Sequence, residues 1–295
     1  MELAPILLFT YKRLDTLLLT VNALKNNDYA SASTLYIFSD GAKSEKDINE
    51  VIKVRKYLKS ISGFNKILIY ESNTNQGLAN SIIAGVSEVI KVHKKVIVVE
   101  DDLITSTNFL SFMNNALNFY IKKTNVFSIS GYSPPILNPN NDIYFTKRAS
   151  SWGWATWNDR WSQIDWDVTS YCSFKNNIFQ RRKFNTMGSD LSRMLDKQIK
   201  GKINSWAIRW VYHQFINNLY TVYPTTSKII NIGTGLDATH TKDSFNRFYT
   251  RLDNSNKIYF DFEHDVKINK IYLKQFLKQF SIYTRIKYKL LNLFN

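Results

Sequence analysis

The sequence predicts an α/β protein whose central sheet is mostly parallel and carries helices on both faces. Strand-sized apolar runs, such as residues 6–9 and 96–99, alternate with segments that carry large apolar residues at helical spacing. Runs that are apolar throughout indicate strands covered on both sides, as in a parallel sheet. With 44% hydrophobic residues in 295, the chain can bury a core large enough for such a fold.

The first hundred residues contain the clearest elements. The expected order is strand 6–9, helix 14–26, strand 34–39, helix 45–60, strand 67–71, helix 78–92 and strand 94–99. Ligands bind such sheets at the carboxyl ends of the strands. The polar segments at those ends are residues 10–13, 40–41, 75–77 and 100–102. We therefore expect these four segments to meet at one edge of the sheet.

The pattern is looser after residue 103. We expect a helix at 106–123, a strand at 126–130, a helix at 206–218 and short strands at 221–223 and 228–230. Between the first strand and the second helix of this region lie five tryptophans, at positions 152, 154, 157, 161 and 166. Trp157 and Trp161, four residues apart, are expected to be core neighbours on a helix.

The net charge of +15 calls for an anionic partner. Residues 265–295 hold seven Lys or Arg and one acidic residue, so much of the excess is C-terminal. The sequence contains no fingerprint of a nucleic-acid-binding module, so we expect no nucleic-acid partner. Three observations predict a cytoplasmic protein. The apolar runs are too short to span a bilayer, the start does not resemble a signal peptide, and Cys172 is the single cysteine.

Three acidic residues, Glu100, Asp101 and Asp102, directly follow the fourth strand. Since side chains alternate along a strand, we expect Glu100 and Asp102 on one side and Asp101 on the other, unless a turn intervenes. Adjacent carboxylates repel one another and need a counter-cation, and oxygen ligands suit Mg²⁺ or Mn²⁺. The alternative is a solvated turn or a helix N-cap.

Six motifs, in their order and spacing, resemble those of GT-A glycosyltransferases. The motifs are PILLFTYKR (5–13), IFSDG (37–41), NQGLANSI (75–82), VVEDDL (98–103), SSWGWATW (150–157) and NIGTGLDATHT (231–241). Within that fold the chain most resembles bacterial surface-polysaccharide transferases related to the Golgi α-mannoside β-1,2-N-acetylglucosaminyltransferase. The resemblance covers roughly residues 4–242. It implies a nucleotide-sugar-binding half (1–103) and an acceptor-binding half (104–264) of one domain, followed by a tail (265–295).

The resemblance also implies roles for the residues at the strand ends. Arg13 would contact phosphate, Asp40 the base, Asp101 the ribose, Asp102 the metal and Glu100 the donor sugar. The nucleotide site as a whole would comprise Thr10, Tyr11, Arg13, Asp40, Gln76, Gly77, Glu100 and Asp101. Each role has a structural competitor. Arg13 can be a surface cation, Asp40 can form the Asp-Gly turn, and Gly77 can allow a tight helix start.

The catalytic base cannot be transferred from the resemblance. In the Golgi enzyme the base lies in a Trp-Asp-Asp-Trp segment, whereas the matching residues 206–210 here, WAIRW, contain no acid. An inverting transfer needs a group that takes the acceptor proton. The candidates are Asp237, which shares a glycine-rich loop with His240, and Asp159, Asp165 and Asp167 after the tryptophans. His240 would bind metal or phosphate, and Trp152 and Trp154 would stack on a sugar.

The tail combines apolar residues at helical spacing with lysines on another face, which predicts a basic amphipathic helix. Such a helix lies on an anionic membrane surface, or it packs on the body or on a second subunit of a homodimer.

The function implied is a metal-dependent, inverting transfer of a hexose or N-acetylhexosamine. The donor would be a nucleotide-diphosphate sugar, a UDP-sugar, and the acceptor a capsule or O-antigen glycan or a lipid-linked oligosaccharide. This activity would take place at the inner face of the plasma membrane. The competing interpretations are a non-catalytic glycan- or membrane-binding module on the same scaffold and, from charge alone, a nucleic-acid-binding protein.

Overall fold

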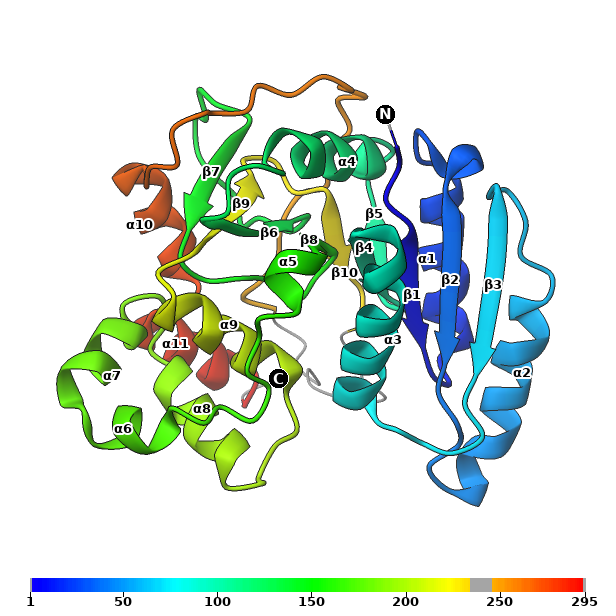
Figure 1. Cartoon of the computed structure of the whole chain (residues 1–295), viewed down its shortest axis with the longest axis horizontal. Helices are drawn as coiled ribbons and strands as arrows, with labels where there is room; N and C mark the ends of the chain where they lie inside the picture. Colours follow the sequence, from blue (N-terminus) through cyan, green and yellow to red (C-terminus); the bar gives the residue numbers. More distant parts are fainter. Residues whose placement is uncertain (1, 234–245, 294–295) are drawn as a thin grey trace.

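The computed structural model describes residues 2–233 and 246–293. Over these residues, eight strands form the main sheet in the order β3-β2-β1-β4-β8-β6-β9-β7 (Figure 1). In that order the strands are Lys66–Glu71, Thr34–Ser39, Ile6–Thr10, Lys95–Glu100, Trp154–Trp157, Val126–Ser130, Tyr220–Pro224 and Ile143–Thr146. A short second sheet pairs β5 (Leu103–Thr105) with β10 (Ile229–Asn231).

The sheet changes character at its middle. The neighbours among β1 to β4 are all parallel, as expected. The next strand, β8, is antiparallel to both β4 and β6, and β7 is antiparallel to β9, whereas β6 and β9 are parallel. The mostly parallel sheet is therefore confirmed, and every antiparallel pair in it includes a strand from the second half.

Helices cover both faces, which confirms that part of the prediction. Ile6 and Leu8 of β1 pack on the face carrying α1 (Leu14–Lys25), α2 (Ile48–Leu58) and α4 (Phe109–Phe119). The alternate residues Leu7 and Phe9 pack on the face carrying α3 (Leu78–His93), α5 (Asn158–Trp161) and α9 (Trp206–Ile216). All four of these β1 side chains are at most 3% exposed, as the unbroken apolar run requires.

The sequence placed most early elements within a few residues but missed several later ones. The helix expected at 45–60 begins at Ile48, because Glu45–Asp47 form a 3₁₀ turn, and Ala30–Ala32 form another. Three strands (β5, β7 and β8) and the short helices α5, α6 (Tyr171–Asn176), α7 (Ile178–Asn185) and α8 (Leu191–Ile199) were not predicted. Trp157 ends β8, so it is not a helix neighbour of Trp161, although both side chains are 2% exposed as expected.

The tail forms two helices where one was expected, α10 (Lys270–Lys278) and α11 (Ile282–Leu291). Each begins with its own cap: Asn269 Oδ1 accepts from the backbone of Ile271, and Ser281 Oγ accepts from that of Thr284. Tyr272 and Phe276 of α10 are buried on the body, so α10 packs there. No helix within the described residues has the length and apolar character needed to cross a membrane.

Candidate functional site

The parallel strands β1, β2 and β4 end at the same edge of the sheet, where their following loops are bonded together. The backbone N–H of Asp40 donates to the carbonyl of Thr10 (3.0 Å), which joins the ends of β2 and β1. The backbone N–H of Tyr11 and the hydroxyl of Thr10 donate to Asp101 Oδ2 (3.2 and 3.0 Å), which joins the ends of β1 and β4. The expected meeting of these segments is thus present in the described structure.

Arg13 connects the two aspartates. Its Nη2 donates to Asp101 Oδ1 at 2.6 Å and to Asp102 Oδ2 at 2.8 Å. Strand alternation does not separate these carboxylates, because β4 ends at Glu100 and residues 101–102 form a turn, which is the exception that the expectation allowed. In this arrangement Arg13 neutralises acidic side chains, and phosphate contact by Arg13 stays a prediction.

Within the part of the chain that the structure describes, three acidic side chains follow one another at this edge, and Arg13 contacts two of them. Burial, followed by the charges of Asp102 and Asp101, raises the pKa of Glu100 well above its ordinary value. Burial also raises the pKa of Asp101, against the opposing charge of Arg13. Burial disfavours the charge of Arg13, but the two aspartates outweigh this and raise the pKa of the guanidinium. Further positive charge at this edge would therefore stabilise the ionised carboxylates.

The described residues include no ready-made group of three His, Cys, Asp or Glu side chains that would hold a metal ion. Magnesium-type sites in nucleotide-binding proteins commonly use one or two carboxylates, and the phosphates and water supply the other ligands. Asp102, whose side chain is 13% exposed, would provide such an oxygen ligand beside two further acids. The donor set and its excess of negative charge fit a divalent cation held jointly with a diphosphate.

The Asp40 carboxylate accepts hydrogen bonds from groups of the protein itself. Its Oδ1 accepts from the backbone of Gly41 and Gln76 (2.9 and 2.8 Å), and its Oδ2 accepts from Gly77 N (2.9 Å) and Asn75 Nδ2 (3.1 Å). Four donors satisfy the carboxylate, so no free lone pair is left for a nucleotide base. The Asp-Gly turn is the role that the structure supports, and the base contact expected for Asp40 is corrected.

The loop that Asp40 holds leads into α3. Gly77 has φ +74° and open space around the position of an added Cβ, so the glycine serves the turn into the helix. The Gln76 side chain donates to Thr74 Oγ1. Across the edge, the Tyr11 hydroxyl donates to Asp47 Oδ2 and accepts from Lys43 N. Nucleotide contacts by these residues stay predictions.

Sequence reasoning missed two groups that shape this edge. Arg55 donates to the carbonyl oxygens of Ser39, Asp40 and Ser72, and so supports the ends of β2 and β3 from α2. A Cβ on Gly233 would lie 2.0 Å from Asp102 Oδ2, so the backbone there passes against the acidic side chain. The glycine pair in the 231–241 motif was the available signal for this close approach, whereas no sequence signal pointed to Arg55.

The candidates for the base are only partly described. Asp237 and His240 lie outside the described residues. Asp165 accepts from Thr169 Oγ1 and from the backbone of Thr169 and Asp167. Burial opposes its charge, but these hydrogen bonds outweigh burial and lower its pKa. Asp159 pairs with Arg160 through both oxygens, and Asp167 is exposed.

The segment matched to the base of the Golgi enzyme is the start of a buried helix. Trp206 and Trp210 of α9 are 3% and 1% exposed and pack against Trp154 with ring centroids 5.1 and 4.4 Å apart. Trp154 itself is fully buried, so the expectation that it stacks on a sugar is wrong. Its neighbours in β8 and α9 fill the space that a ligand would need.

Trp152 is placed differently, because it lines a cavity of about 180 Å³. The other aromatic lining residues are Tyr132, Tyr223, Phe248, Phe276 and Phe280, and the polar ones include Arg148, Ser150 and Ser151. Tyr132 and Phe248 meet the Trp152 ring edge-on, with centroids 4.9 and 5.4 Å away. Phe276 and Phe280 come from the tail, so α10 helps to enclose this cavity.

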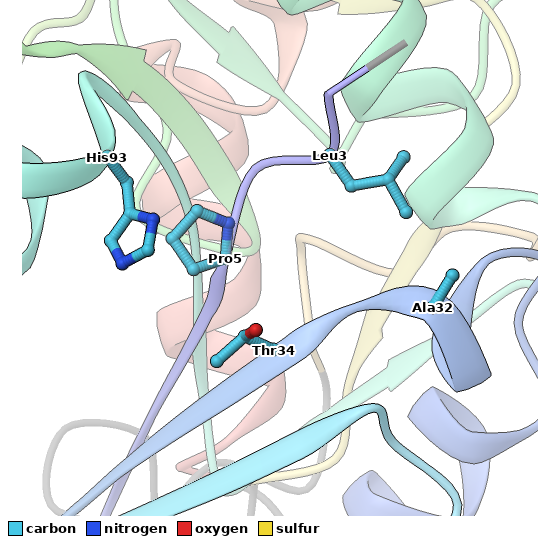
Figure 2. A pocket seen from close by; sticks show the side chains of 5 residues that line it. All are labelled: Leu3, Pro5, Ala32, Thr34 and His93. Carbon is cyan, nitrogen blue, oxygen red and sulfur yellow. The ribbon is translucent and has the colours of Figure 1, made fainter.

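A second cavity, of about 300 Å³, lies away from the acidic edge. Figure 2 shows its lining residues, Leu3, Pro5, Ala32, Thr34 and His93, around the amino ends of β1 and β2. His93 Nε2 lies 2.8 Å from the Tyr36 hydroxyl. None of the lining residues is acidic, and they stand at the opposite end of the strands from residues 100–102, so this cavity is not part of the candidate site.

No family model matches the sequence, and none of the curated proteins matches it either. Among solved structures, S. aureus TarS 1-349 is 10% identical with a TM-score of 0.43, over 79% of this chain and 61% of that one. Its complex with UDP-GlcNAc is 11% identical with a TM-score of 0.34, over 47% and 36% of the two chains.

The mannosyltransferase PcManGT from Pyrobaculum calidifontis, in complex with GDP-Man and Mn²⁺, is 10% identical with a TM-score of 0.37, over 54% and 46%. The chain spans less than two thirds of the length of each of these proteins. Likenesses this distant do not bear on activity, and membership of the Golgi enzyme's family stays a prediction.

Proposed function

We propose that the chain is a metal-dependent glycosyltransferase that transfers a sugar with inversion from a nucleotide-diphosphate donor, a UDP-sugar, to a cell-surface glycan or lipid-linked oligosaccharide. The observation that carries the proposal is the excess of acid at the carboxyl ends of the parallel strands, where Arg13 is the cation shared by Asp101 and Asp102. Such an edge is where sheets of this kind bind ligands. A diphosphate can occupy so acidic an edge only with a cation, which supports metal dependence.

In this proposal Asp102 holds Mn²⁺ or Mg²⁺, and the ion supplies charge neutralisation for the departing diphosphate. Asp101 keeps the turn in place through its bonds to Thr10, Tyr11 and Arg13. Arg13 can also reach a phosphate, because its guanidinium offers five donors and only part of them is used by the aspartates. Glu100, next to Asp102, faces the donor sugar.

The acceptor proton needs a separate base, and Asp237 is the first candidate for it. Asp165 is less suited because its hydrogen bonds to Thr169 stabilise its ionised form and lower its basicity. His240 is the candidate for a further metal or phosphate contact. The acceptor sugar is assigned to the cavity beside Trp152, whose aromatic and serine lining suits the apolar face and hydroxyls of a pyranose. The tail offers two further partners, an anionic membrane at its inner face or a second copy of the chain.

Thermal unfolding with Mn²⁺ and a panel of nucleotide sugars tests this proposal. A matching donor at about 100 times its Kd should stabilise the wild type by about 2.7 kcal/mol. Asp102→Ala should lose that response, whereas Glu88→Ala, which removes an exposed carboxylate from α3, should keep it. The proposal fails if no nucleotide stabilises the wild type, or if Asp102→Ala responds equally to metal and nucleotide.

One observation favours a second function, a non-catalytic glycan- or membrane-binding module. The helix that matches the base segment of the Golgi enzyme has no acid, and its tryptophans are used for packing. Hydrolysis of a nucleotide sugar in the absence of an acceptor distinguishes the two. Metal-dependent release of UDP supports the enzyme, and donor binding without any turnover supports the module.

A further inference from the structure

The last helix of the chain, α11, presents an apolar face to solvent. Its large apolar side chains Ile282, Tyr283, Ile286, Leu290 and, just beyond the helix, Leu293 are 62%, 77%, 55%, 48% and 67% exposed. Ile282, Ile286, Leu290 and Leu293 recur at intervals of four and three residues, and Tyr283 lies three residues before Ile286, so they form one stripe along the helix. Among the described residues of α11 none is buried. An apolar stripe of this kind is a site of contact with something outside the chain.

The neighbouring helix α10 differs from α11, because some of its apolar side chains are buried against the body. Tyr272 and Phe276 of α10 are 5% and 1% exposed, and Phe280, which follows it, is 8% exposed. Gln279 Oε1 accepts from the Tyr132 hydroxyl at 2.7 Å, which fastens the end of this segment. The two helices therefore divide the tail, because α10 packs its apolar face on the body and α11 leaves its own uncovered.

α11 is held in a defined position despite its exposure. Ser281 caps its first turn through the backbone of Thr284. Arg285 Nη1 donates to Ser189 Oγ at 2.9 Å, and the Ser189 hydroxyl donates to the carbonyl of Phe280. These bonds tie α11 to the loop that joins α7 and α8. The stripe thus points outward as part of a fixed surface.

The positive charge around the stripe indicates which kind of partner the stripe binds. Arg285, Lys287 and Lys289 lie on α11, and Lys270, Lys274 and Lys278 lie on α10, with no acidic residue between 266 and 295. A second copy of the same face would bring like charges together, which disfavours a symmetric dimer. An apolar stripe flanked by cations fits the interface of an anionic bilayer, where the apolar side chains enter the acyl region and the cations meet the headgroups.

We propose that α11 alone, with α10 as its fixed base, docks the chain on an anionic membrane surface, so that residues 282–293 lie in the membrane interface. Figure 1 draws α11 below α10, toward the end of the molecule at which β1, β2 and β3 finish. This inference deepens the proposed function by naming the surface from which a lipid-linked acceptor would come. Membrane binding needs neither donor nor turnover, so it can fail or succeed independently of catalysis.

Vesicle flotation of the full-length chain tests the inference. The wild type should float with vesicles of equal parts phosphatidylglycerol and phosphatidylcholine, stay behind with pure phosphatidylcholine, and release as salt rises. Ile286→Glu with Leu290→Glu, and separately Lys287→Glu with Lys289→Glu, should each weaken binding by roughly tenfold or more. These side chains are exposed, so unchanged thermal unfolding verifies that the variants fold.

The matched control is Val92→Glu with Lys94→Glu, which makes the same kinds of change on the nucleotide half, where Val92 is 72% exposed. It should bind vesicles like the wild type. The inference is overturned if the wild type ignores anionic vesicles, or if the α11 variants bind as well as the control. It is also overturned if light scattering without lipid shows a wild-type dimer that Ile286→Glu with Leu290→Glu turns into a monomer.

Discussion

Two ion-pair clusters, one in each half of the molecule, differ in their charge balance. At the strand ends of the first half, Arg13 contacts Asp101 and Asp102, with Glu100 beside them. In the second half, Lys228 pairs with Asp253, and the two side chains are 4% and 6% exposed. Among the described residues, one cation pairs with two acids in the first cluster, whereas one cation pairs with one acid in the second.

The difference separates the candidate binding site from a structural contact. Asp253 also accepts from Asn108 Nδ2 and from the backbone of Ser255, and Lys228 lies over the Phe260 ring, 4.8 Å from its centroid. Each buried charge in that pair is therefore compensated within the protein. The carboxylates at residues 100–102 repel one another beyond what Arg13 offsets, so that edge gains from a bound cation and the pair in the second half does not.

Removing one partner of the balanced pair should have the largest effect on stability. Asp253→Ala leaves Lys228 charged and buried without its carboxylate, and we expect a loss of about 3–5 kcal/mol in the free energy of unfolding. Lys228→Met with Asp253→Asn removes both charges and keeps an acceptor for Asn108, so most of the loss should be recovered. Urea unfolding measures both. Equal losses in the single and double variants would contradict the balance argument.

Acid provides a second test of the same pair. Burial opposes the charge of Asp253, but the hydrogen bonds from Lys228 and Asn108 outweigh it and lower its pKa from 3.8 to about 2. A carboxyl with a lowered folded pKa contributes stability above its unfolded pKa and loses it as the pH falls through the folded value. Between about pH 4 and about pH 2 the wild type should therefore lose more stability than Lys228→Met with Asp253→Asn.

The unbalanced cluster should respond in the opposite way. Asp102→Asn removes one of several repelling charges, and Arg13 keeps Asp101 as a partner, so the free energy of unfolding should stay within about 1 kcal/mol of the wild type or rise. Metal-dependent hydrolysis of the donor should fall on the order of a hundredfold, the loss seen when a group that stabilises transition-state charge is removed. A strongly destabilised Asp102→Asn would show that Asp102 is a structural partner of Arg13.

The same contrast explains what the sequence could predict. The strand–helix units of the first half were recognisable because apolar runs and helical spacing are local patterns, and the meeting of their polar ends follows from a parallel sheet. The bonds within that edge were not recognisable. They depend on contacts between segments that are distant in the sequence. Such contacts decide whether Asp40 faces a base or four protein donors, and whether residues 101–102 continue the strand or turn.

In the second half, the sequence showed the cluster of tryptophans but not which of them are buried and which line a cavity. Trp152 and Trp154 are two residues apart, yet one lines a cavity and the other is fully buried, because β8 begins at Trp154 and Gly153, with φ +55°, turns the chain before it. The break in the tail was not predicted either, although a local signal for it is present in the sequence. Ser281 is a strong N-cap residue before an apolar run, and that local signal marks the start of α11.

The smallest effect is expected for an ion pair that solvent reaches. Lys59 Nζ lies 3.7 Å from Glu71 Oε1, its side chain is 69% exposed, and Glu71 keeps Arg55 as a second partner. Lys59→Ala should change the free energy of unfolding by no more than about 0.5 kcal/mol, since water screens the pair and ordering the lysine costs entropy. Urea unfolding of Lys59→Ala and of Asp253→Ala under the same conditions gives the two changes in the free energy of unfolding for comparison. A loss above about 1 kcal/mol for Lys59→Ala would mean that solvent access does not rank the Lys59–Glu71 contact below the buried Lys228–Asp253 pair.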